Sequence, residues 1–332
     1  MRQKIPGQLS AWQAALFIAL PVVCGMLCLS VGRMSIPVDE IFASLAGEDI
    51  GRQHYAVLWS MRLPRLLLAA LVGAGLSVSG CVFQSMFANP LATPDTLGVA
   101  SGASFGAALA LLLGFGFFGV QASAFLFGVL AVVLTCLMGR GETRGTMILA
   151  GIMVGSLFSA LVSFVKFAAD VESQLPAITY WLMGSLSSAG FQSLRLGAPA
   201  IFVSCVVLLL LRWKLNLLPL SDDEARTFGT NITRLRVIAI ICCTAMTASC
   251  VAMCGQVGWI GLLVPHVCRL LFGQSHARLL PACMGFGAAF LMVVDTAART
   301  ISSAEIPVSI LTAIIGTPIF IAILHRKRGQ VL

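Results

Sequence analysis

The chain is poor in charged residues. Only 10% of its 332 residues are Asp, Glu, Lys or Arg, whereas a soluble domain carries about 25%. Tyr occurs twice and His four times. A large soluble core would still need a charged coat, so this composition excludes almost every water-soluble fold. In place of charge the chain has 58% hydrophobic residues and 32 glycines, a balance typical of closely packed membrane helices.

Patterns that carry covalent chemistry are also missing. The sequence has no phosphate-cradling G-x-x-x-x-G-K-[ST] loop, so we expect ATP hydrolysis, if any, on a separate ATPase chain. It has no clustered nucleophile, base or metal-ligand set, which argues against a membrane-embedded enzyme. We therefore predict a chain that is not an enzyme and that has neither cofactor nor metal. A receptor-like binding module would need an external domain, which the sequence does not show.

Acids are almost absent from the apolar stretches. This argues against an ion-coupled secondary transporter, because that class typically uses membrane-embedded acids. Asp95 and Asp295 are the only candidates, and both lie at predicted helix ends, where capping is the alternative. The eleven cysteines include the pairs Cys24/Cys28 and Cys250/Cys254 inside apolar segments. Helix-face packing explains such pairs, with metal ligation or a disulfide as the alternative.

The apolar stretches predict an all-α, polytopic membrane protein of about ten transmembrane helices. We expect them at about 12–31, 64–83, 95–114, 117–138, 145–165, 192–211, 236–254, 256–272, 279–298 and 306–325. The basic start with Arg2 and Lys4 also suits a cleaved signal peptide. The stretch after it is long enough to span the bilayer and lacks an A-x-A-like cleavage site, so we expect an uncleaved first span.

Loop charge predicts the orientation. The net charge of +8 is spread thinly between the spans, which indicates membrane topology and not a nucleic-acid partner. An even number of spans puts both termini on one side, and that side receives about two thirds of the 21 Lys and Arg residues. We therefore expect both termini in the cytoplasm of a multi-pass protein, with residues 1–332 as one transmembrane domain.

Two loops exceed the length of a turn. The external loop at about 32–60 contains a predicted short helix from Pro37. The cytoplasmic loop at about 215–236 contains Ser221, a good helix start, because the acids that follow it favour the positive end of a helix dipole. Gly229 is a natural stop. The acids are Asp222, Asp223 and Glu224.

Two blocks of sequence resemble one family. From Met61 the chain reads M-R-L-P-R-L-L-L-A-A-L-V-G-A-G-L-S-V-S-G-C-V-F-Q-S-M-F-A-N-P-L-A-T-P-D-T-L-G, and from Gly255 it reads G-Q-V-G-W-I-G-L-L-V-P-H-V-C-R-L-L-F-G-Q-S-H-A-R-L-L-P. D-T-A-A-R at Asp295, I-L-A-G at Ile148 and Y-W-L-M-G-S-L at Tyr180 continue the match in order. The chain is similar to the FecCD or BtuC-like permeases, the membrane subunits of type II ABC importers for ferric siderophores, haem and cobalamin.

The resemblance implies a BtuC-like fold in a bacterial plasma (inner) membrane. It also implies partners besides membrane lipid: a second permease copy or close paralogue, two ATPase subunits and a soluble substrate-binding protein, with no nucleic acid. The expected function is import of a metal chelate, a ferric siderophore first, with cobalamin, haem or molybdate as alternatives. An ion-coupled secondary transporter is the alternative from another class.

The family's positions supply site residues. The resemblance implies that Arg62, Arg65 and Arg299, which lie outside in the predicted topology, meet Glu residues of the binding protein. Anchoring to lipid headgroups or a pair with Asp295 is the alternative. The residues expected to couple to the ATPase belong to a short helix pair within 220–235, with a solvated amphipathic loop as the alternative. They are Ser221, Asp222, Asp223, Glu224, Ala225, Phe228 and Gly229.

The resemblance also implies a substrate route between two permease copies, lined by the fifth and tenth spans. The inner gate is expected before the fifth span, where Thr143 and Thr146 supply small hydroxylated side chains. The signature residues Asn89, Pro90, Pro265 and His266 carry no assigned role. For His266, structural hydrogen bonding is the main reading and a functional role the other.

Overall fold

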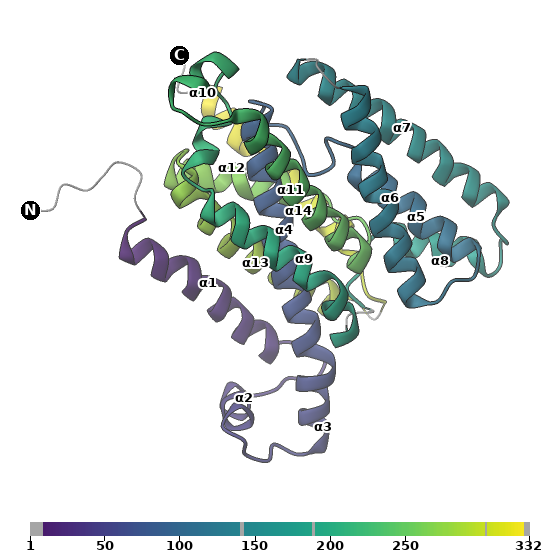
Figure 1. The fold of residues 1–332 in the computed structure, drawn as a ribbon. Helices are drawn as coiled ribbons and strands as arrows, with labels where there is room; N and C mark the ends of the chain where they lie inside the picture. The colour runs from purple at the N-terminus through teal and green to yellow at the C-terminus, as the bar shows by residue number, and fades with distance from the viewer. Residues whose placement is uncertain (1–8, 140–142, 188–189, 303, 329–332) are drawn as a thin grey trace, which may run out of the picture.

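The computed structural model describes residues 9–139, 143–187, 190–302 and 304–328, and every regular element within them is a helix (Figure 1). Seven helices in this part of the chain are long and apolar enough to cross a bilayer. They are α1 (Ala11–Ser30), α4 (Leu63–Met86) with the helical residues before it, α6 (Phe117–Met138), α7 (Arg144–Ala168), α9 (Phe191–Leu210), α11 (Ile232–Cys254) and α13 (His276–Thr300).

Three shorter apolar helices complete the membrane domain: α5 (Val99–Leu112), α12 (Ile260–Phe272) and α14 (Val308–Arg328). Together with the seven longer helices they coincide with the segments expected from the sequence. The prediction of an all-α membrane protein of about ten transmembrane helices is therefore confirmed.

The remaining helices are short. They are α2 (Val38–Leu45), α3 (Arg52–Ala56), η1 (Val57–Arg62), α8 (Gln174–Leu182), η2 (Lys214–Leu217) and α10 (Asp222–Thr227). α2 follows Pro37 as predicted, whereas α8 was not expected, because nine residues give no spanning signal. Figure 1 shows α2 and α3 beyond one end of the bundle and α10 at the opposite end.

The long loops are shorter than the sequence indicates. The external loop was expected to run to about residue 60, but α3 and η1 continue as helix directly into α4. η1 is a π-helical turn in which the amide of Leu63 donates to the main-chain oxygen of Leu58. Pro64 follows at once and has no N–H to continue the α-helical ladder, which accounts for the wider turn. At the other end α11 begins at Ile232, so the cytoplasmic segment ends earlier than expected.

α4 lies at the centre and packs against α13, α11 and α12, while α1 packs on α13. Glycines allow the closest contacts. A methyl group added at Gly73 would lie 2.2 Å from the main-chain oxygen of Gly287, and one added at Gly80 would lie 1.8 Å from that of Gly261. Backbones that approach this closely gain dispersion contact without a hydrophobic driving force, as membrane helices do.

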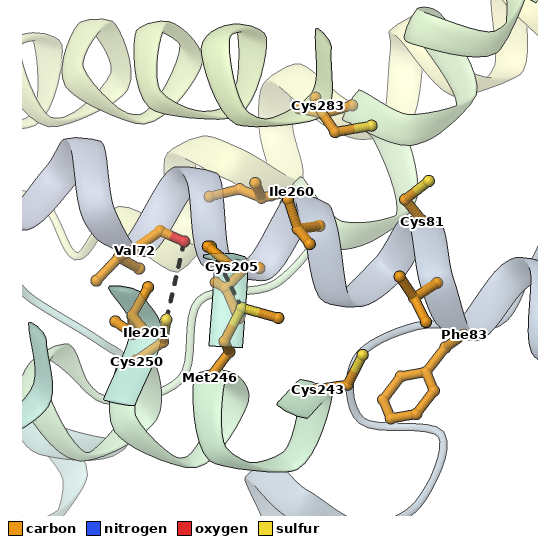
Figure 2. Packing of buried hydrophobic residues seen from close by; sticks show 14 of the residues in the cluster. Val72, Cys81, Phe83, Ile201, Cys205, Cys243, Met246, Cys250, Ile260 and Cys283 are labelled. Carbon is orange, nitrogen blue, oxygen red and sulfur yellow. Dashed lines mark hydrogen bonds between the residues drawn. The ribbon is translucent and has the colours of Figure 1, made fainter. Parts of the chain in front are cut away.

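The cysteines of this core pack as small apolar groups. Figure 2 shows Cys250 of α11 directed at the main-chain oxygen of Val72 on α4, with a sulfur–oxygen distance of 3.9 Å. The thiol of Cys205 on α9 lies 3.5 Å from the sulfur of Met246 on α11. Cys250 and its predicted partner Cys254 are buried, with free thiols. The packing interpretation of this pair therefore accounts for its contacts.

The second group of helices, α5 to α8, lies to one side of α4 (Figure 1). α5 and α6 contact α11, whereas α7 packs mainly against α5 and α6 and lies at the outer edge. The outward face of α7 is apolar apart from three serines. Its exposed residues include Leu149, Ile152, Met153, Ser156, Leu157, Ser159, Ser163, Phe164 and Phe167.

Candidate functional site

Arg65 joins three segments at the end of the bundle that bears α2 and α3. Its Nε lies 2.9 and 3.0 Å from the two carboxylate oxygens of Asp295 on α13, and its Nη1 lies 2.9 Å from both oxygens of Glu305, before α14. The side chains of Arg65 and Asp295 are 12% and 4% exposed. Bidentate geometry and a second carboxylate compensate for the removal of this guanidinium from water. The alternative of a pair with Asp295 is thus realised, and Asp295 lies inside α13 and not at its end.

Arg62 and Arg299 both bind the end of α1. The guanidinium of Arg62, on a side chain that is buried, donates to the main-chain oxygens of Leu29 and Met34. That of Arg299 donates to the main-chain oxygen of Cys28. The last carbonyls of a helix lack intrahelical partners and carry the negative end of its dipole, so two cations here stabilise the terminus.

These contacts bear on the predicted docking role. Sequence reasoning expected the three arginines to face a binding protein, but each guanidinium is turned toward its own chain. The second carboxylate bound by Arg65, that of Glu305, belongs to a side chain that is 29% exposed. Docking through these residues stays a prediction, and it would require an exchange of partners.

The segment that the sequence predicts to be cytoplasmic forms a capped helix. Ser221 N donates to the carboxylate of Glu224 at 2.9 Å, and Glu224 N donates back to Ser221 Oγ at 3.4 Å. This reciprocal capping box fixes the start of α10, and its hydrogen bonds lower the pKa of Glu224. Ala225 is fully buried, Phe228 is 66% exposed, and Gly229 ends the segment with a positive φ of 68°. The backbone of Asp222 and Asp223 begins α10, and their side chains lie outside the described part.

Arg144 ties this segment to α7, a contact that the sequence did not suggest. From the first turn of α7 its guanidinium donates to the main-chain oxygens of Leu218, Pro219 and Leu220, at 3.2 Å and 2.9 Å for the first two. Three successive carbonyls thus share one planar donor group, which holds the segment against the first turn of α7.

A second tether runs through η2. The side-chain oxygen of Asn216 accepts from the amide N–H of His276 on α13 at 2.9 Å and lies 2.9 Å from its Nδ1. The other ring nitrogen lies 2.9 Å from Ser85 Oγ on α4. The segment that leads into α10 is therefore fixed to α4, α7 and α13 at once. A single polar residue in a loop, such as Asn216, gives no signal of this in the sequence.

The predicted gate residues cap α7. Thr143 Oγ1 accepts from the amide of Thr146 at 3.4 Å and lies 3.2 Å from its hydroxyl. Residues 140–142, which precede them, lie outside the described part. A gating role for the two threonines stays a prediction.

Three of the four signature residues line a cavity beside Pro219, in the segment that leads into α10. Asn89, Pro90 and His266 line one cavity of about 480 Å³ together with Pro219 and Arg269. Pro265 is buried inside α12, beside His266. The two blocks of sequence that carry the resemblance thus converge under the segment held by Arg144, which gives three of these four residues a common location.

Asp95 lies between two further cavities. The α12 cavity, about 330 Å³, is lined by Asp95, Thr247, Gln256, Trp259 and Ser309 among others. The α7 cavity, about 560 Å³, is lined by Asp95 and by Ser101, Ser156 and Ser159 among others. Among the described residues that line the two cavities, Asp95 is the only ionisable one.

The carboxylate of Asp95 caps α5. Its Oδ1 accepts from the amides of Ala100 at 2.7 Å and Ser101 at 3.4 Å. The capping interpretation of Asp95 therefore holds. Burial outweighs these hydrogen bonds and raises the pKa of Asp95 to about 6. The side chain is nonetheless partly accessible from the cavities.

The described residues form a bundle of membrane-spanning helices with a capped helix tethered to three of them, α4, α7 and α13. The FecCD transport family model matches residues 20–326. The chain therefore belongs to the FecCD transport family, and it is a permease subunit of an ABC importer whose ATPase is a separate chain.

Individual relatives and a solved structure support the same family assignment. The Molybdate import system permease protein MolB of Haemophilus influenzae is 39% identical over 318 residues, which cover 93% of this chain and 94% of the relative. A probable iron chelatin transport system permease protein of Helicobacter pylori is 38% identical and covers 82% of this chain and 83% of its own length. A solved structure, described as an inward-facing conformation of a metal-chelate type ABC transporter, has a TM-score of 0.88 at 38% identity and covers 94% of this chain and 98% of that chain.

Proposed function

We propose that two copies of this chain, or one copy and a close paralogue, form the pore of an importer that carries a ferric siderophore across the bacterial plasma membrane. The observation that carries this proposal is the outward face of α7. It is exposed over most of the membrane span, and no residue between Thr146 and Val165 is charged. An apolar face with serines at one side suits a route that passes a bulky chelate without binding it tightly.

The second permease would cover that face. Within the described residues, α7 packs mainly against α5 and α6, and α14 also exposes apolar residues, among them Ile310, Ile314 and Ile321. These are the fifth and tenth spans. A dimer that apposes them would place Ser156 and Ser159, and the α7 cavity behind them, along the route.

The ATPase subunits would bind the segment around α10, on the cytoplasmic side together with both termini. Phe228 is a large apolar side chain that is exposed next to a fixed turn, the kind of anchor that fills a pocket on a partner. The tethers through Arg144 and Asn216 then pass movement of α10 to α7, α13 and α4. Closure of the ATPases on ATP would reach the route by this path.

The substrate-binding protein would dock at the opposite end, where Arg65 holds Glu305. A carboxylate from the binding protein can replace Glu305 on the guanidinium, because both are bidentate acceptors of the same geometry. Such an exchange frees the segment before α14, a route helix. Arg62 and Arg299 would act there by holding the end of α1.

Molybdate is the second candidate substrate, on one specific observation: a permease named for molybdate is 39% identical over 93% of this chain. The H. pylori relative is named for an iron chelatin and is 38% identical over less of the chain. Recognition by a separate binding protein allows similar pores to serve both solutes.

The test is reconstitution in liposomes of the permease with the ATPase and the binding protein encoded beside it. Iron uptake and ATPase stimulation by the binding protein loaded with a ferric siderophore would support the proposal. If only the binding protein loaded with molybdate stimulates the ATPase, molybdate replaces the ferric siderophore as the substrate. Stimulation only with cobalamin or only with haem would identify that compound as the substrate instead. An ATPase variant without its catalytic carboxylate is the matched control, and uptake that persists with it would contradict ATP-driven transport.

A further inference from the structure

The carboxylate of Asp95 has no basic partner in the part of the chain that the structure describes. None of the ion pairs formed by the described residues includes Asp95, and no Lys, Arg or His lines either cavity. Its donors include the amide N–H groups of Ala100 and Ser101 at the start of α5 and the side chain of Ser101, all of them neutral groups. A carboxylate withdrawn from bulk water is normally paired with a cation, ligates a metal ion or keeps a proton.

Oxygen atoms gather on the α12-cavity side of this carboxylate. Thr93, Thr247 and Ser309 contribute hydroxyls to the lining and Gln256 contributes an amide. Thr247, on α11, is 1% exposed, and its hydroxyl has no hydrogen-bond partner among the described residues. A buried hydroxyl normally finds a partner, so the missing one points to a ligand in this part of the molecule.

The charge and the donor atoms select the ligand. Hard cations take oxygen ligands, and sites for divalent ions usually supply more than one carboxylate. The α12 cavity offers one carboxylate and otherwise neutral oxygens, so one positive charge balances it. Its volume of about 330 Å³ accommodates a cation with part of its water shell, each water taking about 30 Å³.

We propose that the α12 cavity binds a monovalent metal cation of the size of sodium, held by the carboxylate of Asp95 with the hydroxyl of Thr247. The site joins the start of α5 to α11, and its lining includes Trp259 and Gly261 at the start of α12. An occupied site therefore fixes α5 and α12 against α11. The ion stays with the protein and is not the transported solute, so the proposal does not depend on the substrate or on ATP.

The test is ²²Na⁺ binding to the purified full-length chain in detergent at pH 8, with choline chloride holding the ionic strength constant. Wild type should bind saturably, and sodium should raise its melting temperature relative to choline. Asp95→Asn should lose both effects. Asp170→Asn, which removes an exposed acid after α7, is the matched control and should keep both.

Thr247→Val keeps the shape of the side chain without its hydroxyl, and it should weaken sodium binding about tenfold, which corresponds to the loss of one ligand of about 1.4 kcal/mol. This variant carries the test if Asp95→Asn does not give a monodisperse protein. Absence of saturable binding in wild type overturns the proposal. Binding that survives both substitutions, or that Asp170→Asn also abolishes, overturns it equally.

Discussion

The guanidinium of Arg144 lies 2.9 Å from the main-chain oxygen of Pro219, 75 positions further along the chain. The first residue belongs to the first turn of α7, the helix with the exposed outward face, and the second to the segment that leads into α10. If α10 binds the ATPase and α7 lines the route, as proposed, this contact links the two directly.

Arg144→Gln should uncouple the importer. The charge-assisted hydrogen bonds to three carbonyls are lost, each worth about 1.5–3 kcal/mol when made to a charged group, so α10 can move without α7. Transport per ATP hydrolysed should fall several-fold in proteoliposomes while ATPase binding persists. Lys214→Gln, which removes an exposed cation of the same segment, is the control, and an equal loss there would contradict the link.

Phe228→Asp should detach the ATPase. The exposed side chain loses its apolar contact and places a charge in the partner's pocket, so co-purification of the two subunits should fall by tenfold or more. Ala225→Asp is a less clear test, because Ala225 is fully buried and a buried carboxylate would also unfold α10. Thr227→Asp adds the same charge at an exposed neighbour and should leave co-purification intact. Equal detachment by both substitutions would mean that charge, and not the phenylalanine, is responsible.

Arg65→Met should destabilise the chain more than Glu305→Gln. Removal of Arg65 leaves the buried Asp295 without its cation, at a cost of about 3–5 kcal/mol. Glu305 is partly exposed, and its loss leaves the Arg65–Asp295 pair in place. Thermal unfolding in detergent would show the order, and the reverse order would contradict the assigned roles. If docking exchanges partners on Arg65, Glu305→Gln should also tighten binding of the substrate-binding protein.

Gly80→Ala should lower the free energy of unfolding by about 1–3 kcal/mol or more, the cost typical of overpacking. Its methyl group would lie 1.8 Å from the main-chain oxygen of Gly261, so α4 and α12 must move apart. Gly116→Ala adds a methyl group with nothing within 4 Å and is the matched control. Equal melting temperatures for the two variants would show that α4 and α12 are not so closely packed.

Acidification should stabilise the wild-type chain relative to Asp95→Asn. The pKa of Asp95 is raised from 3.8 to about 6, so the folded state binds its proton more tightly than the unfolded state does. Stability linked to this group therefore increases as pH falls from about 7 through 6 and is lost again as pH rises. Melting temperatures at pH 7.5 and 5.5 would measure it, and a wild-type response identical to that of Asp95→Asn would contradict the raised pKa.

The order of apolar stretches determined much of this protein. Twenty or so apolar residues in a row have one stable form in a bilayer, since only a helix satisfies its own backbone there. The positions of the ten helices, the short helix after Pro37 and the capping box from Ser221 to Glu224 all follow from local sequence. The two stretches from Met61 and from Gly255, which resemble FecCD permeases, predicted the class of transporter.

Contacts between distant residues were decided only by the tertiary structure. Arg62 and Arg299 appear in the sequence as external cations, but folding brings the last carbonyls of α1 to them, and a cation binds the nearer acceptor. Folding likewise brings the carbonyl of Pro219 within hydrogen-bond distance of Arg144 and places Asp95 in the lining of the α12 cavity. Local sequence determines whether a residue is in a helix, because helical hydrogen bonds join near neighbours, whereas the partner of a long polar side chain depends on which helices pack around it.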